Sequence, residues 1–244
     1  MDRVVEPAVV LSAVDYGEAD RIVTFLTERR GRLSAFAAGA RKSRRRFAGA
    51  LEPGTLLRAH LVARRGSTWR LDAVDLDRSH LALRTDLPRL SRSLYALELC
   101  RELVRDEQPH PAIFQLLVGY LDQLEENRAG PTSLIAFELA ALGLAGFMPR
   151  FSACAVCGGG LADPIRFDAD HGGCVCGPCG GRTPHGTPVS AGLAVAMAGL
   201  QAGERTPFPP EQRARARELL NRFVAHQLGR KLNSVDFMAQ LGLD

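Results

Sequence analysis

Residues 57–73 read LRAHLVARRGSTWRLDA, and this stretch decides the class of the first part of the fold. Residues 57–63 carry apolar side chains at every second position, which is the period of a strand with one buried face. Residues 64–67 then supply a short loop that contains a glycine, and a second alternating run begins at Trp69. The stretch therefore predicts a β-hairpin.

Three more strand-like runs precede the hairpin, over residues 4–14, 21–27 and 32–38. Five short strands within about 75 residues, joined by tight turns, suit a small closed barrel. The OB-fold is the natural candidate, and barrels of this kind bind single-stranded nucleic acid along one face. Exposed aromatic rings would stack bases there, although core packing is the expected role of most of the available rings, Tyr16, Phe36, Phe47 and Trp69.

After about residue 85 the apolar residues recur at helical spacing instead. Helices are predicted over about 90–104, 111–124, 134–147, 190–202 and 210–229. The third of these is apolar on nearly every side, which predicts a buried central helix. The whole pattern is that of an α+β protein, with an OB-fold nucleic-acid-binding domain over residues 1–80 and an all-α helical domain over residues 81–244.

Four cysteines interrupt the helical region between about residues 150 and 183, and they form two C-x-x-C pairs separated by 18 residues. This is the spacing of a four-cysteine structural zinc site, in which each pair occupies a tight turn and aims two thiolates at one point. Glycines within and beside both pairs allow the necessary bends. We predict one structural Zn²⁺ per chain, in an inserted zinc knuckle, bound by Cys154, Cys157, Cys176 and Cys179.

The same cysteines allow other interpretations. A lone C-x-x-C pair can be a thioredoxin-like redox centre, the two pairs can form disulfides, or the site can have lost its metal. Cys174 lies two residues before Cys176 and could compete as a ligand, and His171 or His185 could substitute for a cysteine. Cys100 lies in an apolar run and is expected to fill the core.

Positive charge is concentrated early in the chain, since no Asp or Glu occurs between Arg29 and Leu51. Five cations fall within the six residues 41–46, and the flanking glycines Gly39 and Gly49 indicate a flexible loop. Such a loop suits phosphate contacts that release counterions, and a solvated loop without function is the alternative. The predicted DNA-binding residues are Arg29, Arg30, Arg32, Arg41, Lys42, Arg44, Arg45 and Arg46.

Composition and missing motifs exclude several classes of protein. With 244 residues, 46% of them hydrophobic, and a formal net charge of +4, the chain is expected to be soluble and globular. Its apolar stretches are too short to span a bilayer and its start lacks a secretory signal, so a cytoplasmic, nucleoid-associated location is expected. No nucleotide-binding glycine loop, Ser/His/Asp arrangement or open zinc position is visible, so catalysis is not expected.

Three carboxylates near the first turn, Asp15, Glu18 and Asp20, could form a metal site. We expect them instead to shape the turn at the end of a strand, with Asp20 pairing locally with Arg21.

Several strings resemble those of one known family. The most specific are DYGEADR at residues 15–21 and CAVCG at residues 154–158, and they are accompanied by GRL at 31–33, GARK at 39–42, LEP at 51–53, FEL at 137–139 and GRKL at 229–232. With the order barrel, helices and inserted cysteine knuckle, they resemble the bacterial RecO family of recombination mediators over essentially the whole chain. One departure is Cys174, which precedes the second cysteine pair where the family usually has an apolar residue.

The resemblance implies a non-enzymatic protein of DNA repair that binds single- and double-stranded DNA and anneals complementary strands. It also implies partners: the C-terminal tail of the single-strand-binding protein, and RecR, with which such proteins load RecA onto coated gaps, in some pathways together with RecF. Some relatives lack the zinc site, which implies a structural metal.

Two rival functions stay open. One is a zinc-ribbon adaptor of transcription or translation, which would bind RNA or a polymerase. The other is a C-x-x-C thiol oxidoreductase, which requires a reactive cysteine of low pKa.

Overall fold

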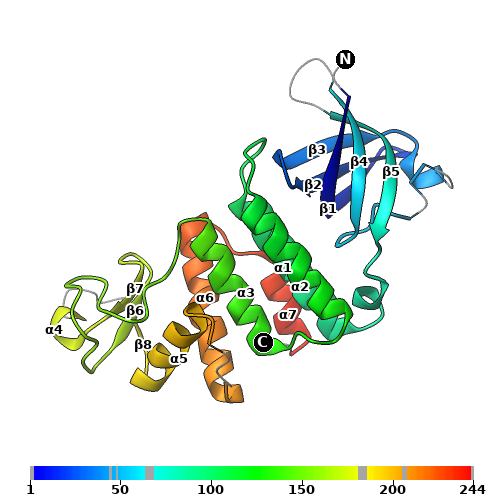
Figure 1. Ribbon diagram of the computed structural model, residues 1–244. Coiled ribbons are helices and arrows are strands. Elements are labelled where there is room, and N and C mark those ends of the chain that lie inside the picture. Colours follow the sequence, from blue (N-terminus) through cyan, green and yellow to red (C-terminus); the bar gives the residue numbers. More distant parts are fainter. Residues whose placement is uncertain are drawn as a thin grey trace. The chain divides into compact units, whose positions relative to one another are not determined.

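The computed structural model describes residues 3–43, 46–47, 49–63, 69–180, 186–204 and 208–242 (Figure 1). The chain divides into two compact units, Met1–Arg128 and Ala129–Asp244. The predicted boundary near residue 80 marks the change from strands to helices, but the first two helices belong to the same compact unit as the strands. As a division between domains, the boundary near residue 80 stays a prediction.

Five strands form a closed barrel in the order β1-β2-β3-β5-β4, which is the OB-fold that the sequence predicts. Strand β1 pairs with both β2 and β4, and a short parallel pairing of β3 with β5 closes the barrel. Among the described strands of the barrel, each one thus has a neighbour on both sides. The strands are β1 (Arg3–Tyr16), β2 (Asp20–Thr27), β3 (Gly31–Ala37), β4 (Leu56–Ala63) and β5 (Trp69–Arg78).

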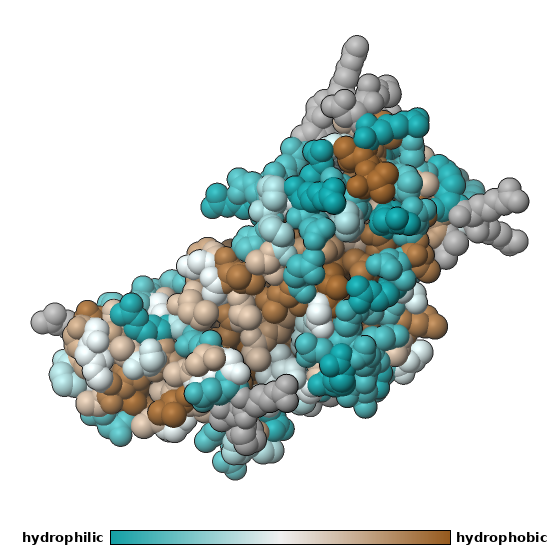
Figure 2. Space-filling view, viewed as in Figure 1, coloured by the Kyte–Doolittle hydropathy of each residue, from teal (hydrophilic) through white to brown (hydrophobic). Residues whose placement is uncertain are grey.

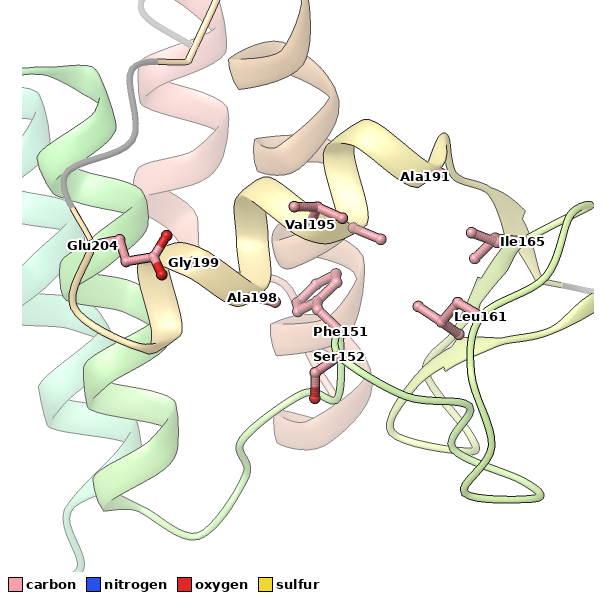
Figure 3. A pocket seen from close by; sticks show the side chains of 10 residues that line it. Phe151, Ser152, Leu161, Ile165, Ala191, Val195, Ala198, Gly199 and Glu204 are labelled. Carbon is pink, nitrogen blue, oxygen red and sulfur yellow. The ribbon is translucent and has the colours of Figure 1, made fainter.

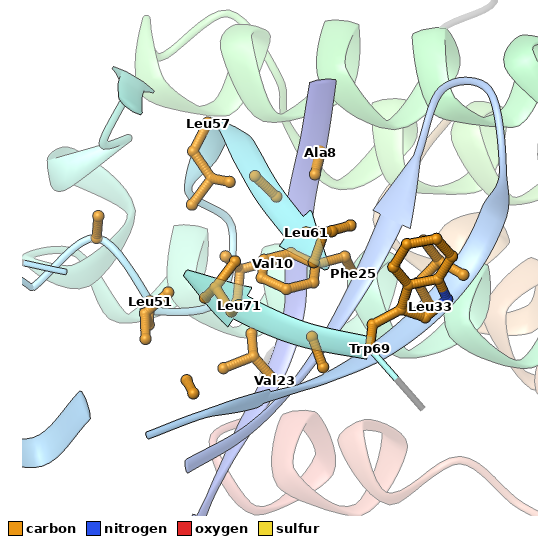
Figure 4. Packing of buried hydrophobic residues seen from close by; sticks show 14 of the residues in the cluster. Ala8, Val10, Val23, Phe25, Leu33, Leu51, Leu57, Leu61, Trp69 and Leu71 are labelled. Atoms are coloured by element: carbon orange, nitrogen blue, oxygen red, sulfur yellow. The ribbon is translucent and has the colours of Figure 1, made fainter. Parts of the chain in front are cut away.

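The barrel core consists of the inward side chains of alternate strand positions (Figure 4). Phe25, Leu33 and Leu71 are all at least 98% buried there. Trp69, 9% exposed, and Phe47, 1% exposed, belong to the same core, so two of the four candidate stacking rings serve packing. The predicted hairpin loop at residues 64–67 lies outside the described residues.

Helices α1 (Leu87–Leu103) and α2 (Pro111–Glu125) complete the first unit. Asp86 caps α1 by accepting a hydrogen bond from the Arg89 backbone N–H at 2.9 Å, and α2 begins at Pro111, the predicted first residue of this helix. The segment between the helices bonds to the barrel, since the Glu107 N–H donates to the Arg32 carbonyl at 3.0 Å. A Cβ on Gly31 would lie 2.0 Å from the Gln108 carbonyl oxygen, so only glycine permits this approach.

A buried histidine links the barrel to α2. His80 lies in the short 3-10 region after β5, with Nδ1 2.7 Å from the Gly54 carbonyl oxygen and Nε2 2.9 Å from Oδ1 of Asp122. Both partners are acceptors, so both contacts are hydrogen bonds when His80 carries both ring protons. Arg78 pairs with the other carboxylate oxygen of Asp122.

The second unit contains α3 (Pro131–Leu144), α5 (Ala191–Gln201), α6 (Pro210–Leu228) and α7 (Asn233–Gln240). Helix α3 is largely buried, as predicted for the apolar central helix, and its Glu138 forms a buried ion pair with Arg217 of α6. Helix α7 was not predicted. None of the helices in the described ranges has both the length and the apolar character that crossing a bilayer requires.

Between α3 and α5 the chain forms the cysteine knuckle. It contains a three-stranded sheet in the order β7-β6-β8 and a single helical turn, which the sequence did not predict. Phe167 of this sheet stacks on Phe151 at 5.3 Å and meets Phe223 of α6 edge-to-face at 5.7 Å, which attaches the knuckle to the helices. The elements are β6 (Arg166–Asp168), β7 (Gly173–Val175), α4 (Gly177–Gly180) and β8 (Thr187–Pro188).

Candidate metal centre and nucleic-acid interface

Two backbone turns position the four cysteines of the knuckle. In the first turn, the Gly158 N–H donates to the Cys154 carbonyl at 2.9 Å, and Gly158 adopts a φ of +73°. In the second, which is the α4 turn, the Cys179 N–H donates to the Cys176 carbonyl at 3.0 Å. The Cys176 N–H also donates to Sγ of Cys154 at 3.4 Å, which joins the two turns.

The four sulfur atoms all lie within 4.8 Å of one another. The sulfurs of Cys157 and Cys176 are 3.9 Å apart, close to the roughly 3.8 Å that tetrahedral geometry requires with Zn–S bonds of about 2.3 Å. An all-sulfur set of four suits a tetrahedral thiophilic ion, and four protein ligands leave no position open for a substrate. The cysteines can therefore hold a metal ion, and they form a possible structural zinc site.

Two thiols of the cluster have pKa values shifted in opposite directions. Burial alone would raise the pKa of Cys154, but the backbone N–H groups that face its sulfur outweigh this and lower the pKa to about 6. At Cys179, hydrogen bonding to Cys176 is the main cause that raises the pKa to about 12. One thiolate is thus stabilised by the fold itself.

Among the described residues, the alternative ligands Cys174 and His171 lie outside the cluster. Cys174 is fully buried in β7, where burial, and then the charge of Cys154, raises its pKa to about 12. His171 faces Asp168, with Nδ1 3.3 Å from a carboxylate oxygen. Cys100 is buried in α1, as predicted, and burial raises its pKa. His185 lies outside the described residues.

The basic segment begins in a short 3-10 turn, Ala40–Lys42, that is fastened to the turn between β1 and β2. The Gly39 N–H donates to Oδ1 of Asp20 at 2.7 Å, and the Arg41 N–H donates to the Ala19 carbonyl at 2.9 Å. The Arg41 side chain pairs with Asp15 at 3.3 Å. Two carboxylates of the DYGEADR string, Asp15 and Asp20, thus hold the start of the basic segment in place.

The predicted local ion pair of Asp20 with Arg21 is wrong. Arg21 pairs instead with Asp15 at 3.0 Å and with Glu52 at 3.1 Å, because Asp20 is directed to the backbone of Gly39.

The remaining cations of this segment differ in their surroundings. Lys42 is exposed. Arg46 is also exposed, donates to the Ala38 carbonyl at 2.6 Å and lies 5.0 Å from the ring centre of Phe47. Arg44 and Arg45 lie outside the described residues.

The other three predicted cations, Arg29, Arg30 and Arg32, lie at the opposite end of β3, which spans about 20 Å at about 3.3 Å per residue. Arg30 donates to the buried Glu6 at 3.1 Å and lies 5.4 Å from the Trp69 ring, and Arg32 pairs with Asp106 at 2.6 Å. Arg29 is exposed beside them. The structure therefore divides the predicted interface into two groups, and acidic partners compensate two charges of the second group.

The second unit also contains an apolar cavity of about 500 Å³ that the sequence did not predict. Figure 3 shows helix α5 along one side of it and Leu161 and Ile165 of the knuckle along the other. Val195, on α5, is 72% exposed at its rim. Among the described residues, the lining includes the carboxylate of Glu204 and no cation.

Two family models together match most of the chain. The model described as Recombination protein O N terminal matches residues 1–76, and the one described as Recombination protein O C terminal matches residues 84–236. Curated proteins named DNA repair protein RecO are similar over essentially their full length. That of Myxococcus xanthus is 59% identical and covers 100% of both chains. That of Anaeromyxobacter sp. (strain K) is 50% identical, over 99% of this chain and 98% of the relative.

Proposed function

This chain belongs to the RecO family of DNA repair recombination proteins, and from that premise we propose that it acts as a non-enzymatic recombination mediator. In this proposal it binds single- and double-stranded DNA, anneals complementary strands, and promotes RecA loading onto coated single-stranded gaps together with RecR.

The observation that carries the proposal is the position of the basic segment on the OB barrel. Its first turn is bonded to the β1–β2 turn, so Arg41, Lys42 and Arg46 are presented at a defined end of the barrel. Arg44 and Arg45 add two charges in the same stretch of sequence. Cations held along an OB barrel attract the phosphates of any sequence, which annealing of arbitrary strands requires.

The second group contributes less in this proposal. Arg30 and Arg32 are committed to acidic partners, so Arg29 is the cation of that group that we propose for phosphate contact. A single strand that contacts both groups would follow β3 along its length.

The proposed cofactor is one Zn²⁺ bound by the four clustered cysteines, Cys154, Cys157, Cys176 and Cys179. When bound, the ion would cross-link the two turns of the knuckle. The chain's own aromatic contacts then carry this rigidity to helix α6.

The proposed partners follow from family membership: RecR, the C-terminal tail of the single-strand-binding protein, and indirectly RecF and RecA. We do not assign the tail to the apolar cavity beside α5, because the described lining offers a carboxylate and no cation to an acidic peptide.

The decisive experiment is annealing of complementary strands coated with the cognate single-strand-binding protein. We expect this protein to accelerate annealing of the coated strands, and RecR to support RecA loading on a coated gap. A competition between single-stranded DNA and structured RNA tests the rival adaptor function. Failure to anneal coated strands, together with a preference for RNA, would overturn the proposal.

A further inference from the structure

A row of apolar side chains lies on the outside of the barrel, across three neighbouring strands. Val14 of β1 pairs in register with Ile22 of β2, and Ile22 pairs with Phe36 of β3. Tyr16 lies two residues beyond Val14, on the same face of β1. The rings of Tyr16 and Phe36 are 5.9 Å apart and nearly perpendicular, at 85°. We name these four residues the outer row.

The outer row is exposed in a way that packing does not require. Val14 is 62% exposed, Tyr16 57% and Ile22 38%, and Phe36 is half-buried, whereas the next row on the same face consists of polar side chains, among them Thr24 and Ser34. Single exposed apolar residues are ordinary, but a contiguous aromatic and aliphatic row marks a binding surface. Hydrophilic side chains predominate on the face of the barrel that Figure 2 shows, with hydrophobic groups in small patches between them.

Positive charge lies directly beside the outer row. Arg41, at the start of the basic segment, donates to the carbonyls of Gly17 at 3.2 Å and Glu18 at 3.3 Å, in the turn that follows Tyr16. On the other side, Arg70 of β5 is the register neighbour of Phe36; its side chain is 42% exposed and pairs with Asp72 at 2.7 Å. Rings bordered by cations on two sides complement a chain of bases bordered by phosphates.

Two of the three acidic residues near Tyr16 already have partners, and the third, Glu18, is exposed in the turn that follows Tyr16. Asp15 is paired with both Arg21 and Arg41, and Asp20 accepts the backbone N–H of Gly39. Their charges are compensated within the fold, which leaves Lys42 and Arg46 to face a ligand.

We propose that Tyr16 and Phe36 form a platform on which the bases of single-stranded nucleic acid stack, with the phosphates directed toward Lys42 and Arg46. Because the two rings are nearly perpendicular, each engages a different nucleotide. The platform rests on the proposed DNA-binding function and deepens it: it adds a contact that depends on bases to one that depends on phosphates, while remaining tolerant of sequence.

The test is a binding cycle that separates bases from phosphates. Wild type, Tyr16→Ala, Phe36→Ala and the conservative Tyr16→Phe are titrated against oligothymidylate and against an abasic strand of equal length and charge. Each alanine variant should lose about 5- to 100-fold in affinity for oligothymidylate, and Tyr16→Phe should retain wild-type affinity. The alanine variants should bind the abasic strand as wild type does, with an unchanged dependence on salt.

A matched control is Leu76→Ala on β5, because Leu76 is also a large exposed apolar residue of the barrel, at 56%, but lies outside the outer row. Its affinity for both strands should equal that of wild type, and circular dichroism should show all variants folded. Wild-type affinity of Tyr16→Ala and Phe36→Ala for oligothymidylate would overturn the platform and leave the phosphate contacts intact. If wild type itself fails to bind oligothymidylate, the DNA-binding function fails and the platform with it.

Discussion

The buried ion pair of Glu138 and Arg217 allows a quantitative prediction about the second unit. The Glu138 side chain is 0% exposed and that of Arg217 is 4% exposed, and the pair joins α3 to α6. Arg217 also donates to Oδ1 of Asn221 at 3.2 Å, one turn further along α6. The substitution Glu138→Gln keeps the shape of the side chain but removes the charge that compensates a buried guanidinium.

The expected cost follows from this burial. Removing one partner of a fully buried ion pair costs about 3–5 kcal/mol, because the remaining charge loses the attraction that offset its desolvation. Replacing both partners by apolar residues of similar volume, Glu138→Leu with Arg217→Met, removes the buried charge altogether. The double variant should therefore be more stable than Glu138→Gln, and close to wild type.

Urea unfolding, followed by circular dichroism in buffer containing zinc, measures the effect. With slopes of about 1–3 kcal/mol per molar urea, the midpoint of Glu138→Gln should fall by about 1 M or more. The matched control is Lys231→Met, which breaks an ion pair whose side chains are 56% and 60% exposed and should cost at most about 1 kcal/mol. A loss below about 1 kcal/mol for Glu138→Gln, or a double variant less stable than the single one, would refute the reasoning.

Three further predictions concern the candidate sites and the link between barrel and helix. Cys154→Ser should destabilise the protein and lower its bound zinc, measured by elemental analysis, well below one equivalent. Cys174→Ser should keep the metal. The reverse pattern would assign Cys174 as the ligand. Wild type should bind single strands with a slope of log K against log salt of roughly −3. The triple variant with alanine at Arg44, Arg45 and Arg46 should have a slope flatter by about 2. An unchanged slope in the folded triple variant would exclude the loop as the DNA-binding site. Burial alone would raise the pKa of Asp122, but its two basic partners, His80 and Arg78, outweigh burial and hold this pKa below its ordinary value. The ionised Asp122 therefore contributes stability that is present above about pH 4 and is lost as the pH falls through the lowered pKa. In urea unfolding between pH 3 and 7, Asp122→Asn should lack this acid-dependent loss, and a parallel loss in wild type and variant would contradict it.

The features that the sequence predicted depend on short-range patterns. The two C-x-x-C pairs predict the convergence of four sulfurs because each pair is a local turn, and one further contact between turns completes the set. The alternation of residues 57–63 predicts β4 because side-chain period and strand geometry coincide. By contrast, the compensation of Arg30 and Arg32 was not predictable from their acid-free surroundings in the sequence. Glu6 and Asp106, which pair with them, lie 24 and 74 residues away.

The sequence indicates that one helix needs a buried ion pair, although it does not identify both partners. Glu138 is the single charged residue in the apolar run 134–147, and a charge on a helix that is apolar all round needs a buried partner. The pattern identifies the residue that needs a partner, but not Arg217, because the partner depends on how α3 and α6 pack.

The position of the outer row depends on an irregularity that no periodic pattern contains. Strict alternation along β1 would place Val14 and Tyr16 on the same side as Ala8 and Val10, inside the barrel. The register between β1 and β2 shifts between Val10 and Ser12, and beyond this bulge it is Ala13 that packs against the core. The bulge reverses the faces, so the side chains of Val14 and Tyr16 turn outward. The Tyr16 ring, which strict alternation would place in the core, therefore lies beside the basic segment, as the proposed platform requires.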